Sequence, residues 1–325
     1  MSLRPRSSRA GSAVVRACVS GGSVPGLGDA PAFTLTTPPR MSLPVLVAVP
    51  HAGRSYPASI IARMRDPALA QLRLEDRHVD RLGVALARET GAALLIAHAP
   101  RAMLDLNRAE DDVDWDMVEG GRPFGSPSPA VAEHSNARAR SGLGLVPRRL
   151  PGSGEIWRGR LAPTDLAARI EGIHRAYHAA LAEALRKIRD AWGAALLIDL
   201  HSMPPLRPEE GESRAPVFVL GDRFGASCHH GLTSRALTHL QRRDVSAAQN
   251  RPYAGGYVLD RHGKPQAGFH ALQVEVCRAA YLDRHMSEPG PGLLGVAATL
   301  TALVRELGAE TALLGGQDGL RQAAE

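Results

Sequence analysis

The sequence predicts an α/β protein with a three-layer α/β/α arrangement around a mixed, mostly parallel sheet. Short apolar runs alternate along the chain with longer segments of helical periodicity, and this alternation favours parallel strands with helices on both faces. Two of the apolar runs end in histidines, as expected where strands deliver polar groups to the edge of an open sheet. Aromatic residues make up only 4% of the 325 residues, so the core must consist mainly of Leu, Val, Ile and Ala.

The chain divides into a leader, one domain and a tail. Residues 1–42 are rich in Ser, Gly, Pro and Arg without a sustained period, so we expect a disordered basic leader whose removal at Met41 leaves folding and activity unchanged. Residues 43–310 are predicted to form a single α/β domain, with residues 110–160 as a long loop insertion over the site. Residues 311–325 are expected to form a flexible tail.

Apolar runs predict the strands and apolar spacing predicts the helices. Residues 44–50 and 194–198 are apolar almost throughout, as strands buried on both faces are. Residues 270–277 alternate, with three aliphatic residues on one face and Glu275 on the other. Further strands are expected at 93–98, 103–107, 216–220 and 257–259. Helices are expected at 76–90, 163–192, 224–242 and 292–307.

Composition excludes several classes of partner. The net charge of +6 is concentrated in the first forty residues and no dense basic stripe follows them, which argues against nucleic acid. The three cysteines show no paired spacing, so neither a disulfide framework nor a four-cysteine zinc site is expected, and a reducing cytoplasm fits. No apolar run reaches the length of a membrane span. Composition leaves the oligomeric state open.

The two histidine-bearing strand ends predict a metal site. The run Val45–Pro50 leads directly into His51, and the second run leads into Asp199, His201 and Ser202. Ligands of open α/β sheets bind outside the carboxyl ends of the strands. A hydrolytic zinc site takes three protein ligands, usually histidines with a carboxylate, and keeps one position open for water. We therefore expect one Zn²⁺ per chain, held by His51, His201 and an acid.

Two acids compete for the third position. Asp76 is the first choice and Glu75 the alternative, because both lie at the start of a predicted helix. The same acids would also suit a helix N-terminus, whose dipole they complement, so spacing leaves both roles open. Glu275 has two interpretations as well. It could take a proton from a metal-bound water, or it could simply occupy a solvated strand face.

Arginines near the strand ends favour an anionic substrate. Arg101 precedes the segment that ends in Asn107 and Arg108, and a guanidinium grips a carboxylate through two parallel hydrogen bonds. Arg251 and Arg261 flank a glycine-containing loop. His174 and His178 lie four residues apart on the longest helix, but apolar neighbours indicate packing or a supporting role rather than chelation. No nucleophile elbow, P-loop or dinucleotide fingerprint is present.

An ordered set of segments over about residues 44–285 resembles the N-formylglutamate amidohydrolase family. The matching segments are Val49–Gly53, Tyr56–Pro57, Glu75–Leu82, Asp105–Arg108, Ser141–Gly144, Val146–Arg148, Tyr177–His178, Asp199–Pro204, Asn250–Gly256 and His270–Glu275. That family is similar in turn to zinc carboxypeptidases and aspartoacylases. Carboxypeptidases carry their metal-binding glutamate three residues after the first histidine, where this chain has Arg54, so the acid must come from elsewhere.

The resemblance implies a zinc-dependent amidohydrolase that cleaves N-formyl-L-glutamate to formate and L-glutamate. It implies His51, His201 and Asp76 or Glu75 as metal ligands, with Glu275 and Arg108 as catalytic residues. Substrate contacts are expected from Arg101, Asn107, Ser202, Asn250, Arg251, Gly255, Gly256 and Arg261. The alternatives are a zinc amidohydrolase for another N-acyl amino acid or peptide-like amide, and a non-catalytic anion-binding protein on the same fold. In each case the partner is a small anion.

Overall fold

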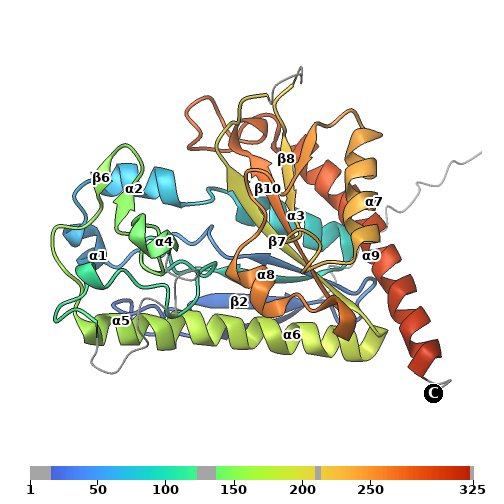
Figure 1. Ribbon diagram of the computed structural model, residues 1–325, viewed down its shortest axis with the longest axis horizontal. Helices are drawn as coiled ribbons and strands as arrows, with labels where there is room; N and C mark the ends of the chain where they lie inside the picture. The colour runs from blue at the N-terminus through green and yellow to red at the C-terminus, as the bar shows by residue number, and fades with distance from the viewer. Residues whose placement is uncertain (1–15, 123–136, 209–213, 323–325) are drawn as a thin grey trace, which may run out of the picture.

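The computed structural model describes residues 16–122, 137–208 and 214–322, and its centre is one eight-stranded sheet (Figure 1). The strand order is β1-β2-β4-β3-β7-β10-β8-β9, and the central four strands are mutually parallel. Antiparallel strands join on either side. The strands are β1 (Ala17–Gly21), β2 (Phe33–Thr37), β3 (Val45–Val49), β4 (Ala93–Ala97), β7 (Ala195–Met203), β8 (Phe218–Gly221), β9 (Ala247–Gln249) and β10 (Phe269–Cys277). A separate hairpin joins β5 (Arg149–Leu150) to β6 (Gly154–Glu155).

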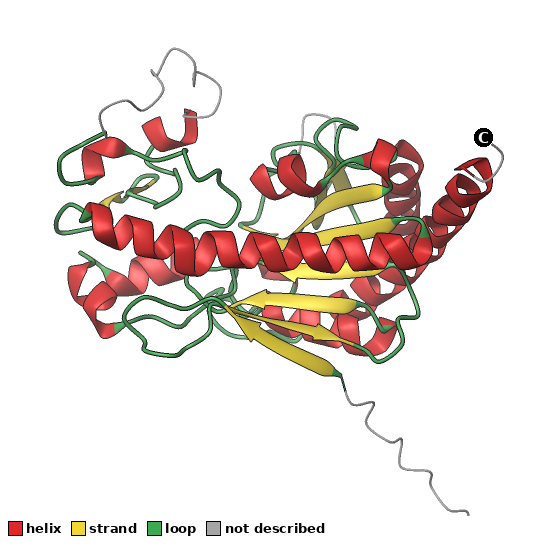
Figure 2. Cartoon of the chain, turned by 90° about the horizontal axis from the view of Figure 1, so that it is seen from below, coloured by secondary structure: helices red, strands yellow, loops and turns green. Residues whose placement is uncertain are grey.

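Helices cover both faces of the sheet, which confirms the predicted α/β/α layering. One face carries a continuous helical rod that lies over the strands (Figure 2), made of α5 (Pro163–Arg169), the π-helical turn η2 (Ile170–Arg175) and α6 (Ala176–Trp192). The other face carries α3 (Val79–Thr90), α7 (His230–Gln241) and α9 (Leu293–Gln322). Alternate residues of β3 face the two layers, because Leu46 packs with the rod and Val47 with the opposite helices.

The remaining helices are short and lie near the ends of the strands. They are α1 (Ala58–Arg63), α2 (Pro67–Leu74), α4 (Ala137–Arg140), α8 (Tyr257–His262) and the 3₁₀ turns η1 (Trp115–Met117), η3 (Pro265–Ala267) and η4 (Arg278–Ala280). Much of the predicted insertion at 110–160 is irregular, although it includes η1, α4 and the β5–β6 hairpin, and residues 123–136 lie outside the described part. None of the described helices is long and apolar enough to cross a lipid bilayer.

The expected disordered leader is the largest correction to the predicted fold. Strands β1 and β2 lie within residues 17–37, and β2 pairs with β4. The segment also contributes to the core, since Val24 and Phe33 are buried and Phe33 meets Tyr177 of α6 edge to face. The few apolar residues among many small and polar ones are enough for two strands because the sheet edge supplies their hydrogen-bond partners.

Three smaller predictions also differ from the structure. Residues 103–107 form no strand, because their polar backbone groups bind a loop and side chains instead of a neighbouring strand. Residues 257–259 belong to helix α8, whose Val258 amide donates to the side chain of the distant Asn107. The tail expected to be flexible continues α9 as far as Gln322.

Candidate metal centre

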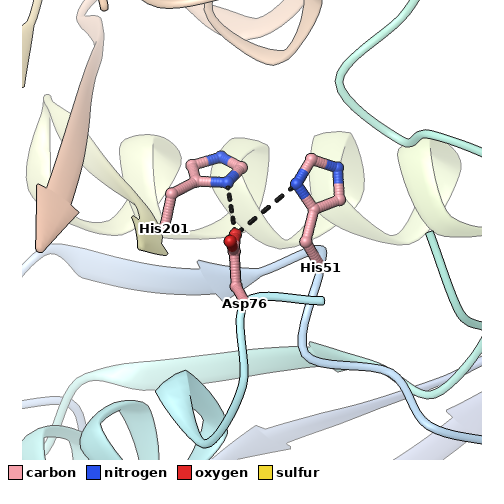
Figure 3. Close-up of side chains that lie close together, drawn as sticks. All are labelled: His51, Asp76 and His201. Carbon is pink, nitrogen blue, oxygen red and sulfur yellow. Dashed lines mark hydrogen bonds and ion pairs between the residues drawn. The ribbon is translucent and has the colours of Figure 1, made fainter. Parts of the chain in front are cut away.

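Neighbouring parallel strands bring the two predicted histidines to one edge of the sheet. Strand β3 ends just before His51, and its register with β7 pairs Ala48 with Asp199, two residues before His201. The backbone amide of Asp76 donates to the carbonyl of His51 at 2.9 Å, which fixes the turn between α2 and α3 beside that strand end. The side chains of His51, Asp76 and His201 consequently converge from three segments of the chain (Figure 3).

The three converging side chains offer one ligand atom each within 4.8 Å of one another, and all three are buried. Asp76 Oδ2 lies 3.0 Å from His201 Nδ1 and 3.6 Å from His51 Nδ1. His51 Nδ1 has no hydrogen-bond partner in the structure although it is buried, which is costly for a polar nitrogen unless a ligand occupies the site. Two imidazoles and a carboxylate are a donor set that suits a divalent transition metal.

A carboxylate holds the outer nitrogen of each of these histidines. Asp105 Oδ1 lies 2.8 Å from His51 Nε2, and Asp199 Oδ2 lies 2.9 Å from His201 Nε2. Because a carboxylate only accepts, each Nε2 carries a hydrogen and each Nδ1 is directed toward the centre. Such outer carboxylates fix the ring orientation and increase the basicity of metal-ligating histidines. The position of Asp105 in the sequence predicts no such role for it.

The structure brings Asp76, and not Glu75, to the histidines. The carboxylate of Glu75 turns toward Arg77, whose Nε lies 3.8 Å away. Ser202 Oγ donates to Asp76 Oδ1 at 3.0 Å, which leaves Oδ2 for the histidines. Burial opposes ionisation, but the hydrogen bond from His201 and the nearby ring of His51 hold the pKa of Asp76 well below its usual value. Burial also works against His201, yet Asp199 and Asp76 raise its pKa well above the usual value.

Glu275 lies on β10 directly beside His201 of β7, and its side chain lines the cavity next to the metal centre. The residue is buried, so it does not occupy a solvated face. Gln273 Nε2 donates to Glu275 Oε1 at 3.0 Å. Burial raises the pKa of Glu275 to about 7, with a further rise from Asp76 and an opposing effect of His201. A carboxyl group with this pKa can exchange a proton near neutral pH.

A cavity of about 410 Å³ opens beside the metal centre, and five arginines line it. The predicted catalytic Arg108 lines this cavity, and so do five of the predicted substrate contacts: Arg101, Asn107, Ser202, Gly255 and Gly256. Three predicted residues do not line it. Asn250 binds Asp222 Oδ1 at 2.7 Å, Arg261 binds the Tyr257 hydroxyl, and Arg251 is exposed. The sequence does not show which side chains of residues 250–261 point into the cavity, because that depends on the conformation of the loop and of helix α8 that follows it.

The cavity also contains polar residues for which the sequence predicted no role, among them Arg73, Arg138, Tyr253 and Arg278. Arg278 directly follows β10, so the search at strand ends that found His51 would also have found it. Its guanidinium donates to Ser202 Oγ at 3.1 Å and to the Glu75 carbonyl at 2.8 Å, which supports the turn that carries Asp76. Arg73 and Arg138 reach the cavity from α2 and α4, and no local pattern distinguishes them from other surface arginines.

Acids, imidazoles and arginines gathered at the carboxyl ends of parallel strands are the arrangement of an α/β enzyme with its pocket at this edge of the sheet. The family model described as N-formylglutamate amidohydrolase matches residues 43–282. The chain belongs to this family, as the motifs predicted, and is a hydrolase that acts on an amide C–N bond.

Individual relatives agree with this assignment. The N-formylglutamate deformylase of Pseudomonas aeruginosa is 30% identical over 271 residues, which cover 82% of this chain and 92% of that protein. The deformylase of Pseudomonas putida is 29% identical over 74% of this chain and 82% of that protein. The crystal structure of N-formylglutamate amidohydrolase from Ralstonia eutropha JMP134 is 31% identical, with a TM-score of 0.75 over 86% of this chain and 98% of that one.

Proposed function

We propose that this chain hydrolyses N-formyl-L-glutamate to formate and L-glutamate at a single divalent-metal centre, with Zn²⁺ as the metal. The observation that carries the proposal is the convergence of His51, Asp76 and His201, whose ligand atoms lie within 4.8 Å of one another beside an arginine-lined cavity. Relatives that bear the name N-formylglutamate deformylase support the choice of substrate.

The donor set fits zinc because two imidazole nitrogens and one carboxylate leave a fourth position for water or substrate. A zinc ion bound there would polarise the scissile carbonyl and lower the pKa of a water molecule. The outer carboxylates of Asp105 and Asp199 would keep both rings in the ligating orientation. Asp76 is proposed as the third ligand because its Oδ2 faces both rings, whereas Glu75 points elsewhere.

The proton transfers are proposed for Glu275. Ionised Glu275 takes a proton from the attacking water, and the protonated carboxyl then delivers it to the departing amine of glutamate. Arg108 lines the same cavity, and its Nε and Nη1 are occupied by the carbonyls of Leu143 and Asn107. These bonds orient the remaining edge of its guanidinium, which would stabilise the oxyanion that forms on the formyl carbonyl.

Recognition of the glutamate carboxylates is proposed for Arg73 and Arg138. Both are exposed, line the cavity and make no ion pair with any described residue. Arg101 is less available, because its Nε and Nη2 each lie 2.9 Å from Asp105 Oδ2. The guanidinium groups of Arg73 and Arg138 would bind the carboxylates of a small substrate at the end that lies away from the metal centre. Arg101 would contribute less, because Asp105 already neutralises its charge.

The test combines metal analysis with an amide-hydrolysis screen over N-formyl, N-acetyl and N-succinyl amino acids, with and without a chelator. We expect about one zinc per chain in protein purified without added metal, and the highest kcat/KM with N-formylglutamate. Glu275→Gln should retain the metal and lose roughly 10² to 10⁴ of kcat/KM. His201→Asn should lose the metal itself. A metal-free wild type without amidase activity would point to the anion-binding alternative, and preference for another acyl group would redirect the substrate assignment.

A further inference from the structure

The loop from Met103 to Arg108 supplies much of the site without belonging to the sheet. Asp105 holds His51, while Asn107 and Arg108 line the cavity. A loop at this depth needs hydrogen-bond partners for its carbonyl groups, because a buried carbonyl without one costs about 1 to 3 kcal/mol. The partners of these carbonyls therefore decide where the site residues stand.

Side chains of the α5–η2–α6 rod supply these partners. Arg169 Nη1 donates to the Met103 carbonyl at 3.0 Å. His178 Nε2 lies 3.0 Å from the Leu106 carbonyl, and His174 Nε2 lies 2.8 Å from the Arg108 carbonyl. Both histidines are completely buried and project from one face of the helix, four residues apart. They thus reach the carbonyls on either side of Asn107.

The tautomers follow from the partners. A carbonyl oxygen can only accept, so both Nε2 atoms carry the hydrogen. His178 Nδ1 is then an acceptor, and His262 Nε2 donates to it at 3.0 Å. Burial lowers the pKa of His174 and lowers that of His178 well below its usual value, which keeps both rings neutral. Neutral rings donate to the loop without placing an uncompensated charge in the core.

We propose that His174 and His178 are positioning residues for the amide hydrolysis, because their bonds to the carbonyls of Arg108 and Leu106 set the places of Asn107 and Arg108 in the cavity. The proposal deepens the proposed function and rests on it. Neither ring touches the cavity, so both act through the loop. A displacement of about 1 Å in a site residue can cost on the order of 100-fold in rate.

A buried histidine elsewhere in the molecule shows what a purely structural role of His174 and His178 would predict. His239 of α7 is also a fully buried helix histidine, but it pairs with Glu306 of α9 and touches no residue of the site. It therefore offers a matched control for the cost of losing a buried imidazole. If His174 and His178 only filled space, their replacement would lower stability as replacement of His239 does and leave the loop in place.

The experiment replaces each histidine by Phe, which keeps the ring but loses the donor, by Asn, whose amide is too short to reach, and by Gln, which restores a donor near the Nε2 position. Hydrogen exchange is measured on the peptide that covers residues 103–109, together with zinc content, kcat and KM, and His239→Phe serves as the control. We expect the Phe and Asn variants to exchange faster in this peptide and to lose about 10- to 100-fold of kcat/KM with one zinc retained. Gln should recover most of both.

Several results would overturn the proposal. Wild-type exchange and kcat/KM in a folded Phe or Asn variant would do so, as would an equal loss in His239→Phe or no recovery with Gln. Loss of zinc in parallel with activity would show that the bonds serve His51 through Asp105, and not Asn107 and Arg108. If a Phe variant does not fold, the Asn and Gln pair at that position decides. The exchange measurement requires no substrate, so a wrong substrate assignment would leave the loop result readable.

Discussion

Two groups of buried histidines lie in this molecule, and they differ in what holds their outer nitrogens. In the metal centre, Asp105 and Asp199 hold His51 and His201 at 2.8 and 2.9 Å. In the second group, backbone carbonyls hold His174 and His178 at 2.8 and 3.0 Å. Burial alone lowers the pKa of a histidine. The pKa of His201 is nevertheless raised well above its usual value, while that of His178 is well below it.

The comparison shows that the partner of a buried imidazole, rather than its burial, determines what the imidazole can do. A carboxylate fixes the orientation of the ring and increases its basicity, which suits the opposite nitrogen to ligate a metal ion. A backbone carbonyl also accepts the Nε2 hydrogen, but it carries no net charge that would stabilise a protonated ring. The imidazole therefore stays neutral and serves as a fixed hydrogen-bond donor. One residue type therefore builds the centre in one place and supports the loop beside it in another.

The largest expected effect comes from deletion of residues 1–40, which removes β1 and β2. The segment packs against the helical rod that carries His174 and His178. Ser23 N donates to the Gly172 carbonyl of the π-helical turn, and the ring of Phe33 contacts the ring of Tyr177. Its loss should exceed the roughly 3 to 5 kcal/mol expected for Phe33→Ala. Urea unfolding of both proteins measures this loss. An unchanged midpoint after deletion would restore the earlier expectation that the leader is dispensable.

The second prediction removes the charge of the carboxylates that hold His51 and His201. Asp105→Asn keeps the shape of the side chain but not its charge, so zinc affinity or kcat/KM should fall about 10- to 100-fold. Asp199→Asn should act in the same direction through His201. Zinc titration with a competing chelator measures the affinity. Asp222→Asn is a suitable control, because Asp222 is a buried acid bound to Asn250 and lies outside the cavity. An equal loss in the control would contradict the special role of the outer carboxylates.

The smallest expected effect is a loss of stability in acid from His262, whose Nε2 donates to His178 Nδ1. Burial lowers the pKa of His262 to about 3, with smaller contributions from Arg261, Lys264 and His174. The unfolded chain binds a proton near pH 6.5 and the folded chain does not, so stability is complete above pH 6.5 and declines as the pH falls toward 3. At pH 5 the loss from this residue should be about 2 kcal/mol.

Urea unfolding of the wild type and of His262→Gln between pH 8 and pH 5 measures this effect. Glutamine retains a donor for His178 Nδ1 and does not titrate, so the variant should show a shallower decline. Identical slopes would mean that His262 is protonated in the folded protein, and the contrast between the two histidine groups would then fail for this ring.

The sequence predicted the parts of the site that lie on regular strands. His51 and His201 follow apolar runs, and the alternation in β10 placed Glu275 opposite the aliphatic face. Residues whose roles depend on contacts between distant segments could not be predicted in this way. The sequence predicts a strand over residues 103–107, and only the loop that forms there turns Asp105 toward His51 and Arg101. Arg73 and Arg138 belong to short helices whose approach to the cavity depends on how they pack.

By itself the sequence determined the layered fold, the strand ends that carry the imidazoles and the family to which the chain belongs. These features depend on the order of apolar and polar residues along the chain, which is a local property. The tertiary structure alone decided that Asp76 and not Glu75 faces the histidines, that β1 and β2 complete the sheet, and that carboxylates hold one pair of histidines while backbone carbonyls hold the other. Each of these depends on which distant group lies within hydrogen-bond distance, because electrostatic and hydrogen-bond energies depend on separation in space.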